Sequence, residues 1–150
     1  MLQAVFLDLD DTLLDFTGAE AAALSQTLRD FGIRPTPQHL ERYHAINRRH
    51  WAMLEQGLLT RPQVLVQRFE TFLREIDMAP SQGMAISQRY EALLCRQHDL
   101  LPGAVDLLEA LGARYPLYLA SNGTPRVQHP RLDDSGLRPY FQKIFLSEEV

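Results

Sequence analysis

The stretch AVFLDLDDT, residues 4–12, decides the fold. Its apolar first half predicts a buried β-strand, and such a strand delivers its last side chains to the carboxyl edge of a sheet, where open α/β folds bind ligands. Two side chains two residues apart point the same way from an extended backbone. Asp8 and Asp10 can therefore address one reacting atom.

Outward from this strand, residues 19–97 show the apolar spacing of helices, with helix starts at Thr36-Pro37, Thr60-Arg61-Pro62 and Pro80-Ser81. Residues 103–113 predict a further helix, and residues 117–120 and 143–146 predict two more strands. This order predicts an α/β fold with a Rossmann-like, doubly wound parallel sheet of three strands and an inserted α-helical cap. We expect residues 1–17 and 98–150 to form the α/β core and residues 18–97 to form the cap.

Composition narrows the function classes. The chain has 150 residues, 45% of them apolar, with a net charge of −4 and one cysteine. The acidic balance argues against a nucleic-acid partner, and one cysteine gives no disulfide framework. No apolar run approaches the ~20 residues of a membrane span, and the first residues lack the basic region of a signal peptide. The sequence thus predicts a cytoplasmic protein with neither a nucleic-acid nor a membrane partner.

The pattern D-x-D-x-T after an apolar strand resembles the first motif of the haloacid dehalogenase-like hydrolases, and the chain is most similar to their noncanonical pyrimidine nucleotidases. The resemblance implies that Asp8 is a nucleophile that takes up a phosphoryl group and that Asp10 is the acid/base. It also implies Mg²⁺ as the cofactor, held by Asp8 and by the main-chain carbonyl of Asp10, and a small phosphorylated metabolite as the substrate. An acid at position 10 separates the family's phosphatases from its dehalogenases.

A second motif of the same family is a strand that ends in a phosphate-binding Ser or Thr. Ser121-Asn122-Gly123 follows the predicted strand at residues 117–120 and matches it. A hydroxyl and the following N–H groups at a strand-to-helix turn can bind an anion. The resemblance therefore implies that Ser121 and Asn122 bind phosphate, although S-N-G alone is also an ordinary turn.

Several residues outside the two motifs are further candidates for a functional or a structural role. Phe16, behind the first motif, either lines the cleft or belongs to the core. Arg48 and Trp51 in the cap could contact the substrate by ionic pairing and stacking, but Trp51 also has the spacing of a cap core residue. Thr12 is expected to support the nucleophile loop through its hydroxyl, and Asp11 either does the same or is solvated. Pro130 predicts a helix that starts after it or is kinked there.

The family's lysine and its distal acidic residues have no counterpart in this chain. Glu148 and Glu149 could replace the acids, or they could simply be solvated charges. We expect the first strand to lie at an exposed sheet edge that invites self-association, and the chain to be a fragment of a longer phosphatase. A partner chain that completes the sheet is the alternative.

Three hypotheses follow for the function. The first is a Mg²⁺-dependent phosphatase of small phosphate monoesters, in particular nucleoside 5′-monophosphates, that works through an aspartyl-phosphate. The second is a catalytically incomplete fragment that binds only phosphate or a protein. The third is a phosphosugar mutase, which shares the first motif.

Overall fold

The computed structural model describes residues 1–150, which form two compact units. The first unit contains residues 1–19 and 94–150, and the second contains residues 20–93. No helix combines the length and apolar character that crossing a membrane requires. The expected division into domains at residues 17/18 and 97/98 stays a prediction.

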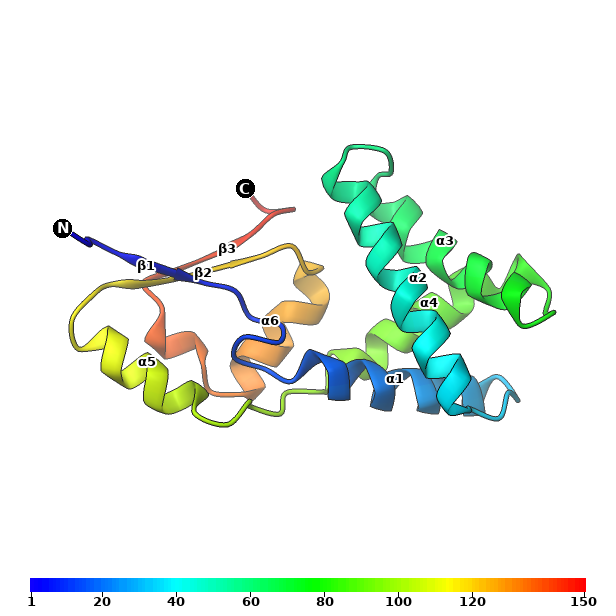
Figure 1. Ribbon diagram of the computed structural model, residues 1–150, viewed down its shortest axis with the longest axis horizontal. Coiled ribbons are helices and arrows are strands. Elements are labelled where there is room, and N and C mark those ends of the chain that lie inside the picture. Colours follow the sequence, from blue (N-terminus) through cyan, green and yellow to red (C-terminus); the bar gives the residue numbers. More distant parts are fainter. The chain divides into compact units, whose positions relative to one another are not determined.

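The first unit is built on three parallel strands in the order β1-β2-β3, which are Val5–Leu7, Leu117–Ser121 and Lys143–Leu146 (Figure 1). In the register, Leu7 lies opposite Leu119 and Ser121 lies opposite Leu146. The structure confirms the α/β fold class and the three predicted strands. It also places β1 at an edge of the sheet, as expected from the sequence.

One face of the sheet carries the core of this unit. Successive right-handed crossovers in the same direction place their helices on the same face, and α5 (Ala104–Gly112) and α6 (Pro125–Asp134) lie on one side of the sheet (Figure 1). The 3₁₀ turn η2 (Arg138–Tyr140) follows α6. The fully or nearly fully buried members of this core are Leu9, Leu13, Leu14, Ala104, Leu108, Leu117, Leu119, Leu132 and Leu137.

The opposite face carries aromatic side chains that helices do not cover. Phe6 stacks on Tyr118 at 5.1 Å between ring centroids and lies 6.1 Å from Phe145. The side chain of Phe6 is 61% exposed. The prediction that the first strand is buried is therefore wrong for this residue, because β1 has a neighbouring strand on one side only and no helix above Phe6.

We expect this exposed edge strand to make the chain associate. An unpaired strand edge beside an exposed aromatic residue is a template for pairing, and a lysine on an edge strand discourages it. As protein concentration rises, the molecular mass of the wild type measured by light scattering should increase above that of the monomer. The mass of Phe6→Lys should stay closer to that of the monomer at the same concentrations. A wild-type chain that stays monomeric at every concentration would contradict the expectation.

Helix α6 contains Pro130 and nevertheless begins at Pro125. Of the two alternatives predicted from the sequence, a start after Pro130 is wrong, and a kink at Pro130 stays a prediction. A proline inside a helix costs ~3 kcal/mol or more, but residues on both sides of Pro130 are buried, with Gln128 and Arg131 each 1% exposed and Leu132 fully buried. Tertiary packing on this face offsets the local cost.

The elements of the second unit are α1 (Phe16–Asp30, which starts in the first unit), α2 (Pro37–Glu55), α3 (Arg61–Glu75), the 3₁₀ turn η1 (Pro80–Gln82) and α4 (Gly83–Leu94). Helices α2 and α3 begin where the sequence signals indicate, whereas α1 begins three residues before its predicted start at Ala19, and Pro80 starts a 3₁₀ turn that leads into α4. Thr36 caps α2 by accepting from the N–H of His39, and Thr60 forms a capping box with Gln63. The buried core contains Tyr43, which stacks on Phe69 at 4.8 Å.

Candidate active site

Asp8 and Asp10 lie in the turn that follows β1, on either side of a fully buried leucine. The Leu9 side chain belongs to the core, and its main-chain oxygen accepts from the N–H groups of Leu13 and Leu14, both at 3.0 Å. These bonds close a tight turn directly after the strand. The apolar residue thus anchors the turn from inside, while the two aspartates lie outside the core.

Asp8 has one free carboxylate oxygen. Its Oδ1 accepts from the N–H of Leu9 at 2.7 Å, whereas Oδ2 accepts no hydrogen bond. Although the side chain reaches the surface, the surrounding protein removes enough water to raise its pKa, and the charge of Asp10 adds to this effect, while the Leu9 bond opposes it. A carboxylate with a free oxygen and incomplete solvation is suited to act as a nucleophile.

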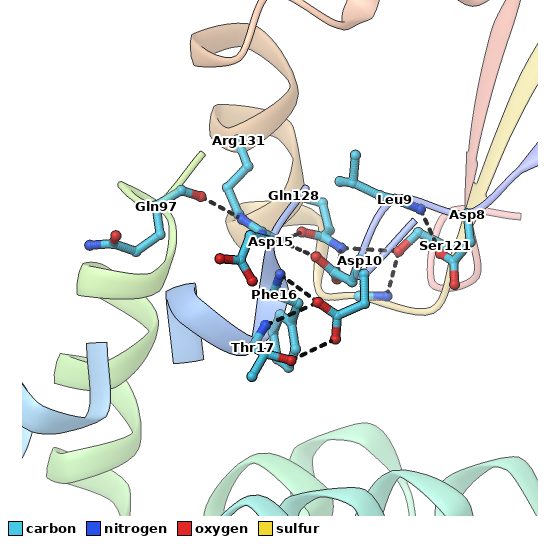
Figure 2. Close-up of polar contacts among 12 residues, drawn as sticks. Asp8, Leu9, Asp10, Asp15, Phe16, Thr17, Gln97, Ser121, Gln128 and Arg131 are labelled. Carbon is cyan, nitrogen blue, oxygen red and sulfur yellow. Dashed lines mark hydrogen bonds and ion pairs between the residues drawn. The ribbon is translucent and has the colours of Figure 1, made fainter. Parts of the chain in front are cut away.

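Asp10 is held by two side chains from α6 (Figure 2). Its Oδ1 accepts from Nη1 of Arg131 at 2.5 Å, and its Oδ2 accepts from Nε2 of Gln128 at 2.8 Å. Arg131 Nη1 also donates to Oε1 of Gln128 at 2.8 Å, and Arg131 Nε donates to the main-chain oxygen of Gln97 at 2.8 Å. The orientation of Asp10 is therefore set by a connected network and not by solvent.

Ser121 ends the strand next to β1 and belongs to the same network. Its Oγ accepts from the N–H of Gly123 at 3.1 Å and from Nε2 of Gln128 at 3.0 Å. A hydroxyl has two acceptor positions and one proton. Because both acceptor positions are used, the proton of Ser121 is left to donate to an anion at this edge of the sheet.

Asn122 is exposed directly after Ser121, and α6 begins three residues later at Pro125. The first N–H groups of a helix favour anions. The structure thus places Asp8, Asp10 and Ser121 at the carboxyl edge of the sheet, with Asn122 at its rim. Their roles in catalysis and in phosphate binding stay predictions.

Asp11, and not Thr12, supports the nucleophile loop. Asp11 Oδ1 accepts from the N–H groups of Phe16 at 2.9 Å and Thr17 at 3.1 Å, and Oδ2 accepts from the hydroxyl of Thr17 at 3.0 Å. The Thr12 side chain is exposed and its hydroxyl makes no hydrogen bond. The expectation for Thr12 is wrong because the turn around Leu9 directs this residue away from the protein.

The oxygen atoms that face outward fit a magnesium ion. The Oδ1 of Asp8 keeps a second lone pair beside its bond from Leu9, and the main-chain oxygen of Asp10 accepts no main-chain hydrogen bond. Both are hard donors of the kind that Mg²⁺ prefers, and the Oδ2 of Asp8 stays free. Mg²⁺ often binds through one or two carboxylates and keeps several waters or substrate oxygens. No group of three or more His, Cys, Asp or Glu side chains gathers here or elsewhere in the chain.

Phe16 lies beside Arg131. The guanidinium carbon of Arg131 lies 5.9 Å from the centre of the Phe16 ring, a cation–π contact. Phe16 is half-buried and forms the first residue of α1. The ring therefore covers one side of the charged network, and its proposed contact with substrate stays a prediction.

Arg48 and Trp51 both lie on α2 in the second unit. Arg48 is exposed, and Trp51 is half-buried with the Arg61 guanidinium 5.4 Å from its ring centre. The buried polar residues of this helix are instead Asn47 and His50. Contact of Arg48 or Trp51 with a substrate stays a prediction.

Glu149 does not supply a carboxylate to the aspartates. Its Oε1 lies 2.8 Å from Nε2 of His129 on α6, and the other ring nitrogen of His129 lies 2.9 Å from Nη2 of Arg138. The carboxylate is thus engaged in a separate surface cluster. The single lysine of the chain, Lys143, has its Nζ 5.0 Å from the Phe145 ring centre.

Sequence reasoning missed Gln128 and Arg131. Both lie in a segment that contains Pro125 and Pro130, and prolines indicate a broken helix. In addition, a Q-x-x-R pair is common on solvated helices. The usable signal is their spacing of three residues, which places both side chains on the helix face that also carries Leu132. Their partner lies 118 and 121 residues earlier in the chain, respectively, so only the fold shows what they bind.

Comparison with known proteins gives one consistent result. The sequence model of a hydrolase family, the haloacid dehalogenase-like hydrolases, matches residues 2–150. The chain is 38% identical over 148 residues to the HAD-hydrolase YfnB of Bacillus subtilis, covering 99% of this chain and 63% of YfnB. The pyrimidine 5′-nucleotidases PynA of Streptococcus pneumoniae and YjjG of Escherichia coli are 37% and 31% identical, with 97% of this chain covered in both cases.

A crystal structure of YfnB, described as bound to magnesium, superposes with a TM-score of 0.93 over 98% of this chain and 66% of that protein. The chain spans 62% of the length of PynA and 63% of the length of YjjG. It thus corresponds to rather less than two thirds of each of these curated relatives.

Proposed function

Because this chain belongs to the haloacid dehalogenase-like hydrolase family, we propose that it is a Mg²⁺-dependent phosphatase of small phosphate monoesters, with nucleoside 5′-monophosphates as the preferred substrates. The observation that carries the proposal is the grouping of Asp8, Asp10 and Ser121 at one edge of a parallel sheet. The preference for nucleotides is supported only by the similarity to two pyrimidine 5′-nucleotidases.

In the proposed reaction, the free oxygen of Asp8 attacks phosphorus and the bond between phosphorus and the ester oxygen breaks. Asp10 gives its proton to the departing alkoxide. Water then attacks the phosphorus of the aspartyl-phosphate, Asp10 takes a proton from this water, and inorganic phosphate leaves while the Asp8 carboxylate is restored. Each bond formed is matched by one broken, and the proton of Asp10 is returned.

The remaining residues bind and orient. The hydroxyl of Ser121 donates to a phosphate oxygen, and Asn122 and the start of α6 add further donors. Mg²⁺, held by Asp8 and the Asp10 carbonyl, supplies positive charge that offsets the repulsion between the carboxylate and the phosphate.

The test is phosphate release from a panel of esters, including nucleoside 5′-monophosphates and sugar phosphates, with and without Mg²⁺. Mg²⁺-dependent release of inorganic phosphate supports the proposal. Binding of phosphate without turnover would support a non-catalytic binding module instead. Conversion of a sugar phosphate to its isomer without phosphate release would support a mutase.

A further inference from the structure

Arg131 is a buried arginine that does not reach solvent or the free oxygen of Asp8. Its side chain is 1% exposed, and three of its hydrogen bonds fix it to Asp10, Gln128 and the carbonyl of Gln97. Its Nη2 is buried without a hydrogen-bond partner. An incompletely satisfied buried cation is costly, and a well-packed apolar side chain at such a position is often as stable or more stable. Stability therefore gives little reason for an arginine here.

Gln128 joins the two halves of the candidate site. Its single Nε2 lies 2.8 Å from Asp10 Oδ2 and 3.0 Å from Ser121 Oγ, while its Oε1 accepts from Arg131. All hydrogen-bonding groups of the amide except one lone pair of Oε1 are used, and the residue is 1% exposed. The proposed acid and the proposed phosphate ligand are thus set relative to each other by one amide group.

Gly123 leaves the space that this amide occupies. A Cβ atom at position 123 would lie 2.3 Å from Gln128 Nε2, closer than side chains tolerate. The small residue of the S-N-G turn therefore permits the approach of Gln128 to Asp10 and Ser121. The network depends on four separate segments that meet at one point, which are the turn at Asp10, the main chain at Gln97, the turn after Ser121 and helix α6.

We propose that Gln128 and Arg131 are positioning residues that orient the Asp10 carboxyl group toward the leaving oxygen of the substrate. This inference rests on the proposed phosphatase function. A carboxylate has about four acceptor positions, and the two bonds from α6 occupy one on each oxygen. The remaining positions then point in fixed directions, where one oxygen can carry the proton that the leaving group needs.

The test uses the leaving group. A nucleoside 5′-monophosphate releases an alkoxide that needs a proton, whereas p-nitrophenyl phosphate releases a stable phenolate that needs little help. The kcat/KM value reports the steps up to departure of the leaving group, so it isolates the acid role of Asp10. Misplacement of a catalytic group by ~1 Å costs on the order of 10²-fold. We expect Gln128→Leu to lower kcat/KM for the nucleotide by roughly 10- to 100-fold and for p-nitrophenyl phosphate by less than about threefold.

Two further variants probe the same network. Arg131→Lys keeps the charge but cannot bind Asp10, Gln128 and Gln97 together, and Gly123→Ala displaces the Gln128 amide without changing it. Both should alter the ratio between the two substrates in the same direction. Gln142→Leu is the matched control, because Gln142 is exposed and only its main chain is hydrogen-bonded, to Leu117. It should leave the ratio unchanged.

An equal loss for both substrates would show a merely structural role and overturn the inference, as would no loss for either. If the wild-type chain releases no phosphate from either ester, the proposed function fails separately. Crystal structures of the wild type and of Gln128→Leu then decide the inference. An Asp10 side chain that turns away or takes several orientations in the variant supports positioning, and an unchanged orientation overturns it.

Discussion

Replacement of Asp8 by asparagine is expected to abolish Mg²⁺-dependent phosphate release, with a loss of at least about 10³-fold in kcat. The amide has the shape of the carboxyl group but lacks the charge that attacks phosphorus. Only Oδ1 of Asp8 has a protein partner, the N–H of Leu9, and an amide oxygen can accept that bond as well. The substitution therefore removes the nucleophile and leaves the turn in place.

The stability of this variant provides the control. Burial raises the pKa of Asp8, so its ionisation in the folded chain is unfavourable, and stability falls as pH rises from the unfolded value through the folded pKa. Asparagine does not ionise, so the variant does not have this loss of stability at pH values above the folded pKa of Asp8. Without Mg²⁺ at neutral pH, we expect a Tm equal to or slightly above that of the wild type, and Mg²⁺ should raise the Tm of the wild type only.

Phosphate release and thermal unfolding, measured on the same samples, check the predicted loss of activity and the predicted Tm. Retained turnover in Asp8→Asn would contradict the nucleophile assignment. A large fall in Tm would instead show that the lost activity reflects misfolding.

The local signals in the sequence predict most of the secondary structure correctly. Thr36 and Thr60 start helices because their side chains accept from the N–H three residues later, and such bonds need no distant partner. The strand from Leu117 and the strand from Lys143 follow equally from short apolar runs. These features depend on residues close together in the sequence, so the sequence alone predicts them.

What could not be predicted depends on long-range packing. Helix α6 forms through Pro130 because Leu132 and its neighbours are buried, which overrides a local preference. Likewise, the sequence indicates Asp10 as a candidate acid but says nothing of Arg131, which reaches it from 121 residues away. The candidate site is thus half local motif and half tertiary contact, and only the first half is visible before the fold is known.

Leu9, the residue between the two aspartates, is expected to matter more for stability than either of them. Leu9→Ala should lower the free energy of unfolding by about 3 kcal/mol, since a buried Leu→Ala change typically costs 2–5 kcal/mol. Leu9 is fully buried with Leu13 and Leu14 in the core of the first unit. A loss of this size is a large fraction of the 5–15 kcal/mol that stabilises an ordinary domain.

Urea unfolding followed by circular dichroism measures this effect, with Leu107→Ala as the matched control. Leu107 lies on α5 and is 42% exposed, so its truncation should change the free energy of unfolding by no more than about 0.5 kcal/mol. Equal urea midpoints for the two variants would contradict the anchoring role of Leu9. Because Leu9 also holds the turn that carries Asp8 and Asp10, Leu9→Ala should lower kcat/KM even where the variant remains folded. The stability of this edge of the sheet and the geometry of the candidate site therefore depend on the same buried side chain.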